Sequence, residues 1–198
     1  MTLPGQAPRL SLRRMRAWLA EPHVARWFLV GSTVEDELDE LQRATTGQEP
    51  THACVVRADA RDIGWCQWYR CADYPAHAEA TQAHPDDVGI DYAIGDPACV
   101  GHGLGTALIA TLVNHIRATH PAAGVIVDPE AANLPSRRVL ENNQFVLLAE
   151  RQLPTEPTDA PIAIYRLPPD PTPIASRSTA SRAGRTPSVP GPNKIRRR

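Results

Sequence analysis

Residues 88–106 read VGIDYAIGDPACVGHGLGT, and residues 88–94 alternate in character as the residues of a β-strand do. Ile90, Tyr92 and Ile94 fall on one face of the predicted strand, and Asp91 falls on the other. Pro97 follows in a Gly-Asp-Pro turn and cannot continue a hydrogen-bonded ladder. The pattern therefore places a carboxylate, Asp91, in the middle of a strand that ends before Pro97.

A glycine-rich loop follows this strand and leads into a helix predicted over residues 106–119. Gly101, Gly103 and Gly105 occupy alternate positions, so the backbone can turn tightly and approach a ligand closely. The free N–H groups of the first helical turn suit a pyrophosphate. The loop lacks both the Lys-Ser/Thr pair of a P-loop and the G-x-G-x-x-G spacing of a dinucleotide-binding fingerprint. The sequence therefore predicts an anion-binding loop, with neither a nucleoside triphosphate nor a dinucleotide favoured as its ligand.

Length and composition favour one α/β domain with unstructured ends. The chain has 198 residues, of which 42% are hydrophobic, and this is enough for one domain with a sizeable core. Residues 168–198 carry a charge of +6 and are rich in Pro, Ser and Arg, so they are predicted to be disordered, as are residues 1–8. Residues 1–167 carry a charge of −7. An acidic domain suits a cationic substrate and disfavours nucleic acid.

The four cysteines form no C-x-x-C pair, and we expect them to be reduced in a chain too large to need disulfide staples. No apolar run approaches the ~20 residues of a membrane span, and no apolar signal-peptide segment follows the N-terminal arginines. We therefore expect a cytoplasmic protein without a membrane partner.

The remaining elements give the fold class α/β, with a central mixed β-sheet flanked by helices. Before the central strand we predict a short strand at 9–13, one or two helices at 14–28 interrupted at Pro22, a helix at 35–43, and a hairpin of strands at 52–57 and 63–69. After the glycine loop and its helix we predict a short buried strand at 124–129, a helix at 133–143, and a closing antiparallel pair at 144–148 and 162–167. The folded domain is thus predicted over residues 9–167.

A second carboxylate, Asp128, ends the short buried strand, and open α/β sheets place ligands at such strand ends. The strands that carry Asp91 and Asp128 flank one helix in the sequence, and a right-handed crossover makes such strands parallel neighbours. We therefore expect both carboxylates to border one cleft. The alternatives are a salt bridge for Asp91 and a turn position before Pro129 for Asp128.

The glycine loop resembles motif A of the GNAT superfamily of acyl-CoA N-acyltransferases, in which Q/R-x-x-G-x-G/A cradles the pyrophosphate of coenzyme A. Val100 stands where the Gln or Arg usually is. Further marks over residues 9–167 resemble the aminoglycoside 6'-N-acetyltransferases of that superfamily. These marks are Gly89-Ile-Asp91, Gly101 to Thr106, Asp128-Pro129, Asn133-Leu134, Arg138, Glu141, Phe145, Gly64 with Gln67 and Tyr69, and Trp18-Leu19 with Trp27-Phe28.

The resemblance implies transfer of an acetyl group from acetyl-CoA, as co-substrate, to the 6'-amine of an aminoglycoside, and hence antibiotic resistance. It implies that Asp91 is the general base or the carboxylate that orients the amine. The coenzyme contacts it implies come from Tyr92, Val100, Gly101, His102, Gly103, Leu104, Gly105, Thr106 and Asn133. The acceptor contacts it implies come from Trp27, Gln67, Tyr69 and Asp128.

Leu140 departs from the GNAT pattern, because many of these enzymes carry there a Tyr that protonates the departing thiolate. A thiolate with a pKa near ~8.5 is a tolerable leaving group, so its loss need not abolish turnover. With an ordinary pKa near ~3.9, Asp91 is a weak base, so we expect proton removal through its placement or through a water.

Residues 70–88 have no clean period and are predicted as a loop with about one helical turn. This acidic stretch is either a wall of the acceptor site or a solvated loop. It also contains His77 and His84, whose spacing fits no zinc pattern, so no metal is expected.

Other functions stay open at this level. A siderophore hydroxylysine acyltransferase or a protein N-terminal acetyltransferase would keep the coenzyme and change the acceptor. A non-catalytic acyl-CoA-binding protein would account for Leu140. The basic tail could bind nucleic acid through phosphates, but it has no aromatic residue for base stacking. The chain could be a monomer or a homodimer.

The composition of residues 168–198 generates a first prediction, because such a segment cannot bury enough apolar surface to order itself. A chain truncated after Asp170 should keep both the Tm and the turnover of the full chain. Thermal melts and acetyl-transfer rates of the two chains would check this. A marked fall in Tm on truncation would show that the tail packs on the domain.

Overall fold

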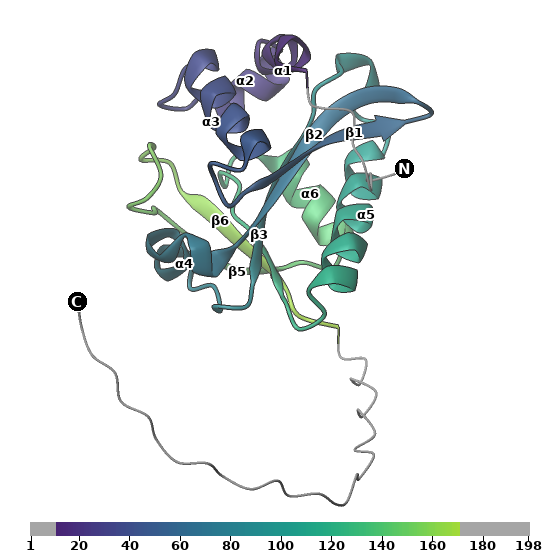
Figure 1. The fold of residues 1–198 in the computed structure, drawn as a ribbon. Coiled ribbons are helices and arrows are strands. Elements are labelled where there is room, and N and C mark those ends of the chain that lie inside the picture. The colour runs from purple at the N-terminus through teal and green to yellow at the C-terminus, as the bar shows by residue number, and fades with distance from the viewer. Residues whose placement is uncertain (1–10, 171–198) are drawn as a thin grey trace, which may run out of the picture.

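The computed structural model describes residues 11–170, which form a six-stranded mixed sheet with helices on both faces (Figure 1). The strand order is β1-β2-β3-β4-β6-β5. The strands are β1 (His52–Ala58), β2 (Arg61–Arg70), β3 (Val88–Ile94), β4 (Val125–Val127), β5 (Val146–Arg151) and β6 (Ile162–Leu167). β3 and β4 are parallel, and every other neighbouring pair is antiparallel. This confirms the predicted fold class, the hairpin and the closing antiparallel pair.

The helices of the described region cover the two faces of the sheet with separate apolar cores. They are α1 (Leu12–Leu19), α2 (Pro22–Phe28), α3 (Val34–Thr46), α4 (Pro75–Thr81), α5 (Leu104–Thr119) and α6 (Leu134–Asn142). Neighbouring strand residues alternate between the cores: Val56 packs with α5 and α6, whereas Val55 packs with α1 and α3. None of these helices is both long enough and apolar enough to cross a bilayer.

The predicted strand at 9–13 is wrong for the residues that the structure describes. Ser11 is extended and precedes α1, which already includes residues 12 and 13, while residues 9 and 10 lie outside the described region. Met15, Trp18 and Leu19 have helical spacing, and all three are buried in the core beside Trp65. The burial of this helical face outweighs the strand-like alternation of a short polar and apolar run.

Residues 70–88 are more ordered than predicted. A 3-10 turn at Cys71–Asp73 leads into α4, which begins at Pro75 as prolines commonly do in a first helical turn. Ala78 and Ala80 pack against a small core formed with β4 and β6. Alanine-rich composition and this packing produce a two-turn helix where the sequence shows no clear period.

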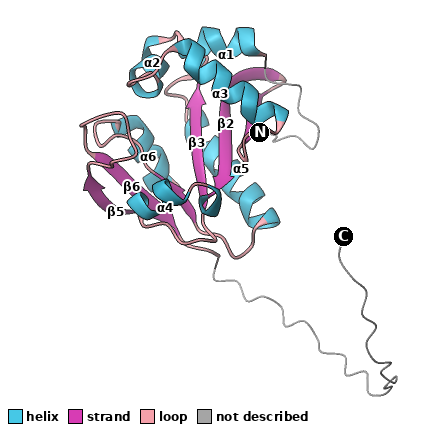
Figure 2. Cartoon of the chain, turned by 60° about the vertical axis from the view of Figure 1, so that its left-hand side comes forward, coloured by secondary structure: helices cyan, strands magenta, loops and turns pink. Residues whose placement is uncertain are grey.

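The sheet opens between β3 and β4. Figure 2 shows the result, in which β2 and β3 run in a different direction from β6 and β5 on the other side of the sheet. β3 pairs with β2 along its whole length, but it pairs with β4 only at Val88 and Gly89. Beyond Gly89 the two strands diverge, so the second half of β3, which carries Asp91, has no hydrogen-bonded neighbour on that side. The predicted parallel arrangement of these strands is confirmed.

The closed end of this opening is held by a buried ion pair. Asp87 is 1% exposed, and both of its carboxylate oxygens accept hydrogen bonds of 2.8 Å from the Arg166 guanidinium. The backbone N–H groups of His84 and Gly124 also donate to it, at 3.0 and 3.1 Å. Burial alone would raise the pKa of Asp87, but these donors hold it below its ordinary value. One carboxylate thus ties together the start of β3, the start of β4 and the end of β6.

Replacement of Arg166 by Ala should destabilise the protein by about 3–5 kcal/mol, because it leaves the Asp87 carboxylate buried without its cation. Denaturant unfolding would measure the loss. The control is Arg43→Ala, which removes an exposed ion pair with Glu49 and should cost no more than about 1 kcal/mol. Equal losses in the two variants would show that Asp87 does not depend on Arg166.

Candidate active site

Two cavities meet at the middle of β3. The first, of about 590 Å³, lies in the opening of the sheet and is lined by Asp91 and Asp128; we call it the acceptor cavity. The second, of about 790 Å³, lies beside the glycine loop, and we call it the loop groove. The residues that line both are Trp27, Phe28, Tyr92, Asn133 and Ser136. A ligand in each cavity would therefore meet the other next to Asp91.

The loop groove is built by backbone that only glycine adopts readily. Gly101 and Gly103 have φ of 82° and 76°, and no atom lies within 4 Å of where a Cβ would stand on either. Gly103 precedes α5 without any side-chain cap, so the first N–H groups of that helix are free for a ligand. The geometry is that of an open anion site at a helix N-terminus.

The loop groove contains most of the residues predicted to contact the coenzyme. Those that line it are Tyr92, Val100, Gly101, Gly103, Gly105, Thr106 and Asn133. The side chains of His102 and Leu104 do not line it: His102 is exposed, and Leu104 packs against the main core. These two residues could contribute only backbone groups there.

Asn133 begins α6, where its side-chain oxygen accepts a hydrogen bond of 3.2 Å from the Ser136 N–H. Its position at the junction of the cavities therefore follows from its capping role. Ser136 in turn bonds the Tyr92 hydroxyl, with 2.8 Å between the two oxygens. β3 and α6 are joined by these contacts at the point where the cavities meet.

Asp91 stands in the middle of β3, as the alternation predicts, and accepts a hydrogen bond of 3.1 Å from Gln67 on β2. Within the described region, no Lys or Arg forms an ion pair with it, which removes the salt-bridge alternative. Burial and the neighbouring charge of Asp128 raise the pKa of Asp91 to about 7, although the Gln67 hydrogen bond opposes the rise. The expectation of an ordinary pKa near ~3.9 is therefore wrong.

Asp128 directly follows β4 and lines the acceptor cavity with Asp91, as predicted. Its side chain is 8% exposed. The predicted acceptor residues Trp27, Gln67 and Tyr69 also line this cavity. The one cleft expected from the order of strands therefore exists, and it gathers all four predicted acceptor positions around Asp91.

The acceptor cavity is strongly acidic. Six carboxylates line it, and no Lys or Arg from the described residues does: Glu37, Glu40, Asp91, Asp128, Glu130 and Glu156. Burial and the charge of Asp128 also raise the pKa of Glu156. Carboxylates crowded in this way are stabilised by a ligand with several positive charges.

Sequence reasoning missed Glu156 and did not assign a role to His77. Glu156 lies in the connection between β5 and β6, about 30 residues from Asp128 in the chain, and His77 lies on α4. Tyr74 and His77 form the wall that residues 70–88 contribute, whereas the acidic Asp73 and Glu79 are exposed. Residues 70–88 thus line this cavity through Tyr74 and His77, and not through their acidic side chains.

Leu140 is fully buried in the main core, so the position offers no group to either cavity. Two hydroxyl-bearing residues, Tyr92 and Ser136, line both cavities instead. Burial raises the pKa of Tyr92 to about 12, against the effect of its bond to Ser136.

Comparison with known proteins identifies relatives for most of the chain. The sequence model of a family described as "Acetyltransferase (GNAT) domain" matches residues 8–153. An aminoglycoside N(6')-acetyltransferase type 1 of Klebsiella pneumoniae is 25% identical over 157 residues, which are 78% of this chain and 76% of that protein.

Similar solved structures support the fold. The crystal structure of aminoglycoside acetyltransferase AAC(6')-Ib with coenzyme A and kanamycin aligns with a TM-score of 0.70 at 23% identity, over 84% of this chain and 94% of that chain. An aminoglycoside N(6')acetyltransferase from Legionella pneumophila aligns with a TM-score of 0.66 at 14% identity, over 84% of this chain and 91% of that chain.

The raised pKa of Asp91 predicts a pH-dependent effect of Asp91→Asn on stability. Because the fold disfavours the ionised carboxylate, the wild-type protein loses stability as the pH rises from the ordinary carboxyl pKa through about 7. Asp91→Asn should therefore be more stable than wild type by on the order of 2 kcal/mol above pH ~8 and by much less near pH ~4.5. Urea unfolding at both pH values would measure this. The exposed control Asp73→Asn should show no such dependence, and a pH-independent effect at Asp91 would contradict the assignment.

Proposed function

Because the chain belongs to the GNAT acetyltransferase family, we propose that it transfers an acetyl group from acetyl-CoA to an amine of a polycationic acceptor, namely the 6'-amine of an aminoglycoside. The observation that carries this proposal is the position of Asp91 where the loop groove meets an acceptor cavity lined by six carboxylates. GNAT enzymes use acetyl-CoA, so the co-substrate follows from the family and the acceptor from the cavity.

Acetyl-CoA would lie in the loop groove with its pyrophosphate on the uncapped N-terminus of α5. Gly101 and Gly103 leave room for the phosphates, and the free N–H groups of the first turn would donate to them. The pantetheine arm would pass Asn133 and bring the thioester to the junction, beside Tyr92. The donor would then face the acceptor cavity across the middle of β3.

The acceptor would bind as a cation. An aliphatic amine is mostly protonated at neutral pH, and the Asp91 carboxylate would first hold the ammonium group and then take its proton. A base with a pKa of about 7 suits this task far better than an ordinary carboxylate, because the optimum pKa of a general base lies near the working pH. Asp128 and Glu156 would bind further ammonium groups of the acceptor.

In the transfer step the amine nitrogen attacks the thioester carbonyl, a C–N bond forms, and the C–S bond breaks. Asp91 has by then taken one proton of the ammonium group. The second N–H proton is lost as the C–N bond forms and passes to the departing coenzyme thiolate, so that the products are the amide and the free thiol. The hydroxyls of Tyr92 and Ser136 are the groups that this chain offers near that thiolate. Leu140 is then compatible with turnover, because proton donation does not have to come from its position.

An aminoglycoside is favoured over other amines by two kinds of support. The charge of the cavity suits an acceptor with several ammonium groups, and the relatives found by sequence are aminoglycoside N(6')-acetyltransferases. A hydroxylysine or a peptide N-terminus brings fewer positive charges and would leave most of these carboxylates unpaired. A panel of acceptors that includes kanamycin, a hydroxylysine and an N-terminal peptide, assayed for release of coenzyme A, would decide among them.

The coenzyme site predicts that Gly103→Val abolishes measurable binding of acetyl-CoA, because a β-branched residue is strained at φ 76° and would obstruct the pyrophosphate. Calorimetry would measure the affinity. Gly47→Val is a matched control: Gly47 has φ 74° and open space around it, but ends α3 outside the loop groove. Unchanged affinity in a folded Gly103→Val protein would contradict the proposed site.

The catalytic role of Asp91 predicts that Asp91→Asn keeps the affinity for acetyl-CoA and lowers kcat by about 10² to 10⁴. In the wild-type protein kcat/KM should rise with pH up to an apparent pKa near 7, since only the ionised carboxylate can accept the proton. Asp128→Asn should chiefly raise the KM of the acceptor. Near-normal kcat in Asp91→Asn on the best acceptor would show that Asp91 is structural.

A further inference from the structure

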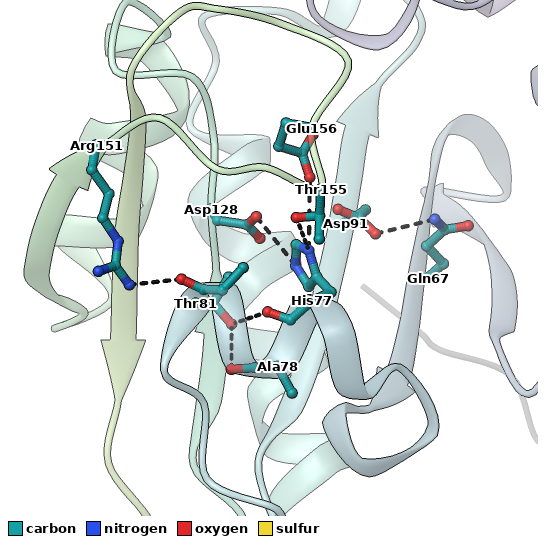
Figure 3. A network of polar contacts seen from close by, with 10 residues as sticks. Gln67, His77, Ala78, Thr81, Asp91, Asp128, Arg151, Thr155 and Glu156 are labelled. Carbon is teal, nitrogen blue, oxygen red and sulfur yellow. Dashed lines mark hydrogen bonds and ion pairs between the residues drawn. The ribbon is translucent and has the colours of Figure 1, made fainter.

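His77 lies between two of the carboxylates of the acceptor cavity (Figure 3). Its Nε2 is 3.3 Å from the Asp128 carboxylate, and its Nδ1 is 3.7 Å from the Glu156 carboxylate. The Thr155 hydroxyl is also 3.3 Å from Nδ1. On the other side, α4 is anchored by the Arg151 guanidinium of β5, which donates to the Ala80 carbonyl at 2.6 Å. The imidazole is thus held at the carboxylates by a packed helix.

The two ring nitrogens point to different carboxylates, and this arrangement favours a proton over a metal ion. One nitrogen of His77 and one oxygen each of Asp128 and Glu156 do lie within 4.8 Å of one another, as metal ligands could. A metal would use only one ring nitrogen, whereas an imidazolium donates at both. The buried Nε2 lies close enough to Asp128 for an ion pair but makes no well-directed hydrogen bond. An imidazolium held between two anions accounts for these contacts.

The groups around His77 favour its charged form. The close approach of the Asp128 carboxylate to Nε2 raises the pKa of His77, burial opposes this, and the charges of Glu156 and Asp91 raise it further. These carboxylates come from β3, from the end of β4 and from the β5–β6 connection. Glu79 on α4 itself is exposed. Among the described residues that line the acceptor cavity, His77 is the one side chain that can carry a positive charge near neutral pH.

We propose that His77 determines acceptor specificity, because its imidazolium occupies Asp128 and Glu156 in place of the acceptor's additional ammonium groups. The inference rests on the proposed function only in taking this cavity as the amine site. A monoamine needs Asp91 alone and leaves His77 in place. A polyamine must displace the imidazolium from the carboxylates, and His77 then loses its proton, so that binding of a polyamine releases a proton to the solvent.

The direction of the pH effect follows from this competition. Below its pKa, His77 is charged and opposes the polyamine; above it, His77 is neutral and both carboxylates are free. The affinity for a polyamine should therefore rise with pH. Ionisation of Asp91 acts in the same direction near pH 7, so a wild-type profile alone does not separate the two groups.

Two variants of His77 separate the effect of its charge from the effect of Asp91 ionisation. His77→Gln is neutral at every pH and His77→Lys is charged throughout the range, so they bracket the wild-type protein. The acceptors are kanamycin, with several amino groups, and 6-amino-6-deoxyglucose, with one. The control is His84→Gln, which removes an exposed imidazole just beyond α4. Tm and affinity for acetyl-CoA establish that each variant is folded.

We expect the wild-type KM for kanamycin to resemble that of His77→Lys near pH ~6 and that of His77→Gln near pH ~8.5. At the lower pH, His77→Gln should have a KM for kanamycin about 10-fold lower than wild type, with a smaller change in kcat, because the charge of His77 also lowers the pKa of Asp91. The KM for 6-amino-6-deoxyglucose should change much less, because a monoamine does not compete with His77 for Asp128 and Glu156. Equal KM values for kanamycin in His77→Gln and wild type at both pH values would overturn the proposal, as would a higher KM in His77→Gln.

A direct measurement covers the case in which a variant fails to fold. The His77 imidazole of the wild-type protein can be titrated by NMR with and without kanamycin, in the presence of coenzyme A. Kanamycin should shift the His77 signal toward the neutral form at constant pH; a signal unmoved by saturating kanamycin would contradict the competition. If kanamycin binds but is not acetylated, the proposed function is contradicted. The titration would still test whether a polyamine competes with His77 for the carboxylates. Absence of kanamycin binding would overturn the inference at His77.

Discussion

The buried ion pair between Asp87 and Arg166 is the constraint on which the site depends. It fastens β3, β4 and β6 together at one end, where the Gly124 N–H also donates to the same carboxylate. Because β3 and β4 then pair at only two positions, the strands separate beyond Gly89 and leave space within the sheet. A fully paired sheet would have filled that space with its own hydrogen bonds and neighbouring side chains. The opening exists because β3 and β4 are held together at one end and are unpaired with each other at the other end.

The electrostatics of the acceptor cavity follow from this opening. Strand β3 supplies Asp91, the end of β4 supplies Asp128, and the two carboxylates face a shared space that contains no Lys or Arg of the described region. Burial of Asp91 and, after it, the nearby charge of Asp128 raise the pKa of Asp91 to about 7, which makes it a better base. The same charges attract a cationic acceptor. One arrangement therefore serves both the binding of an ammonium group and the removal of its proton.

One side of the acceptor cavity is formed where the α2–α3 connection lies against the β5–β6 connection. Gly31, between α2 and α3, has φ 75°, and a Cβ there would lie 2.7 Å from the Cβ of Pro157 in the β5–β6 connection. Glu156 precedes Pro157 and faces His77 from this connection. The carboxylate missed in the sequence is thus positioned by the close approach of Gly31 to Pro157, in segments about 125 residues apart. Its place in the cavity is decided by how these loops meet.

The sequence by itself determined the local elements and the residues that depend on them. Alternation placed Asp91 on a strand, and alternate glycines placed a loop before α5, because these features involve only neighbouring residues. The chain order of β3, α5 and β4 was enough to predict parallel strands and a cleft shared with Asp128. The prediction of a short strand at 9–13 was wrong because a long-range contact outweighs the local pattern. Trp18 is buried beside Trp65, which is distant in the chain, and this burial favours a helix.

Only the tertiary structure decided the chemical state and the full membership of the site. The pKa of Asp91 depends on burial and on Asp128, and neither can be read from a spacing. Leu140 looked like a lost catalytic position, but it is a core residue, and the hydroxyls at the junction come from Tyr92 and Ser136. His77 and Glu156 carried no signal in the sequence, because a helix and a loop that are far apart in the chain converge on one carboxylate only after folding. Interactions between neighbouring residues determine the local secondary structure. The charge state of the site, and the competition for its carboxylates, depend on contacts between residues that are far apart in the chain.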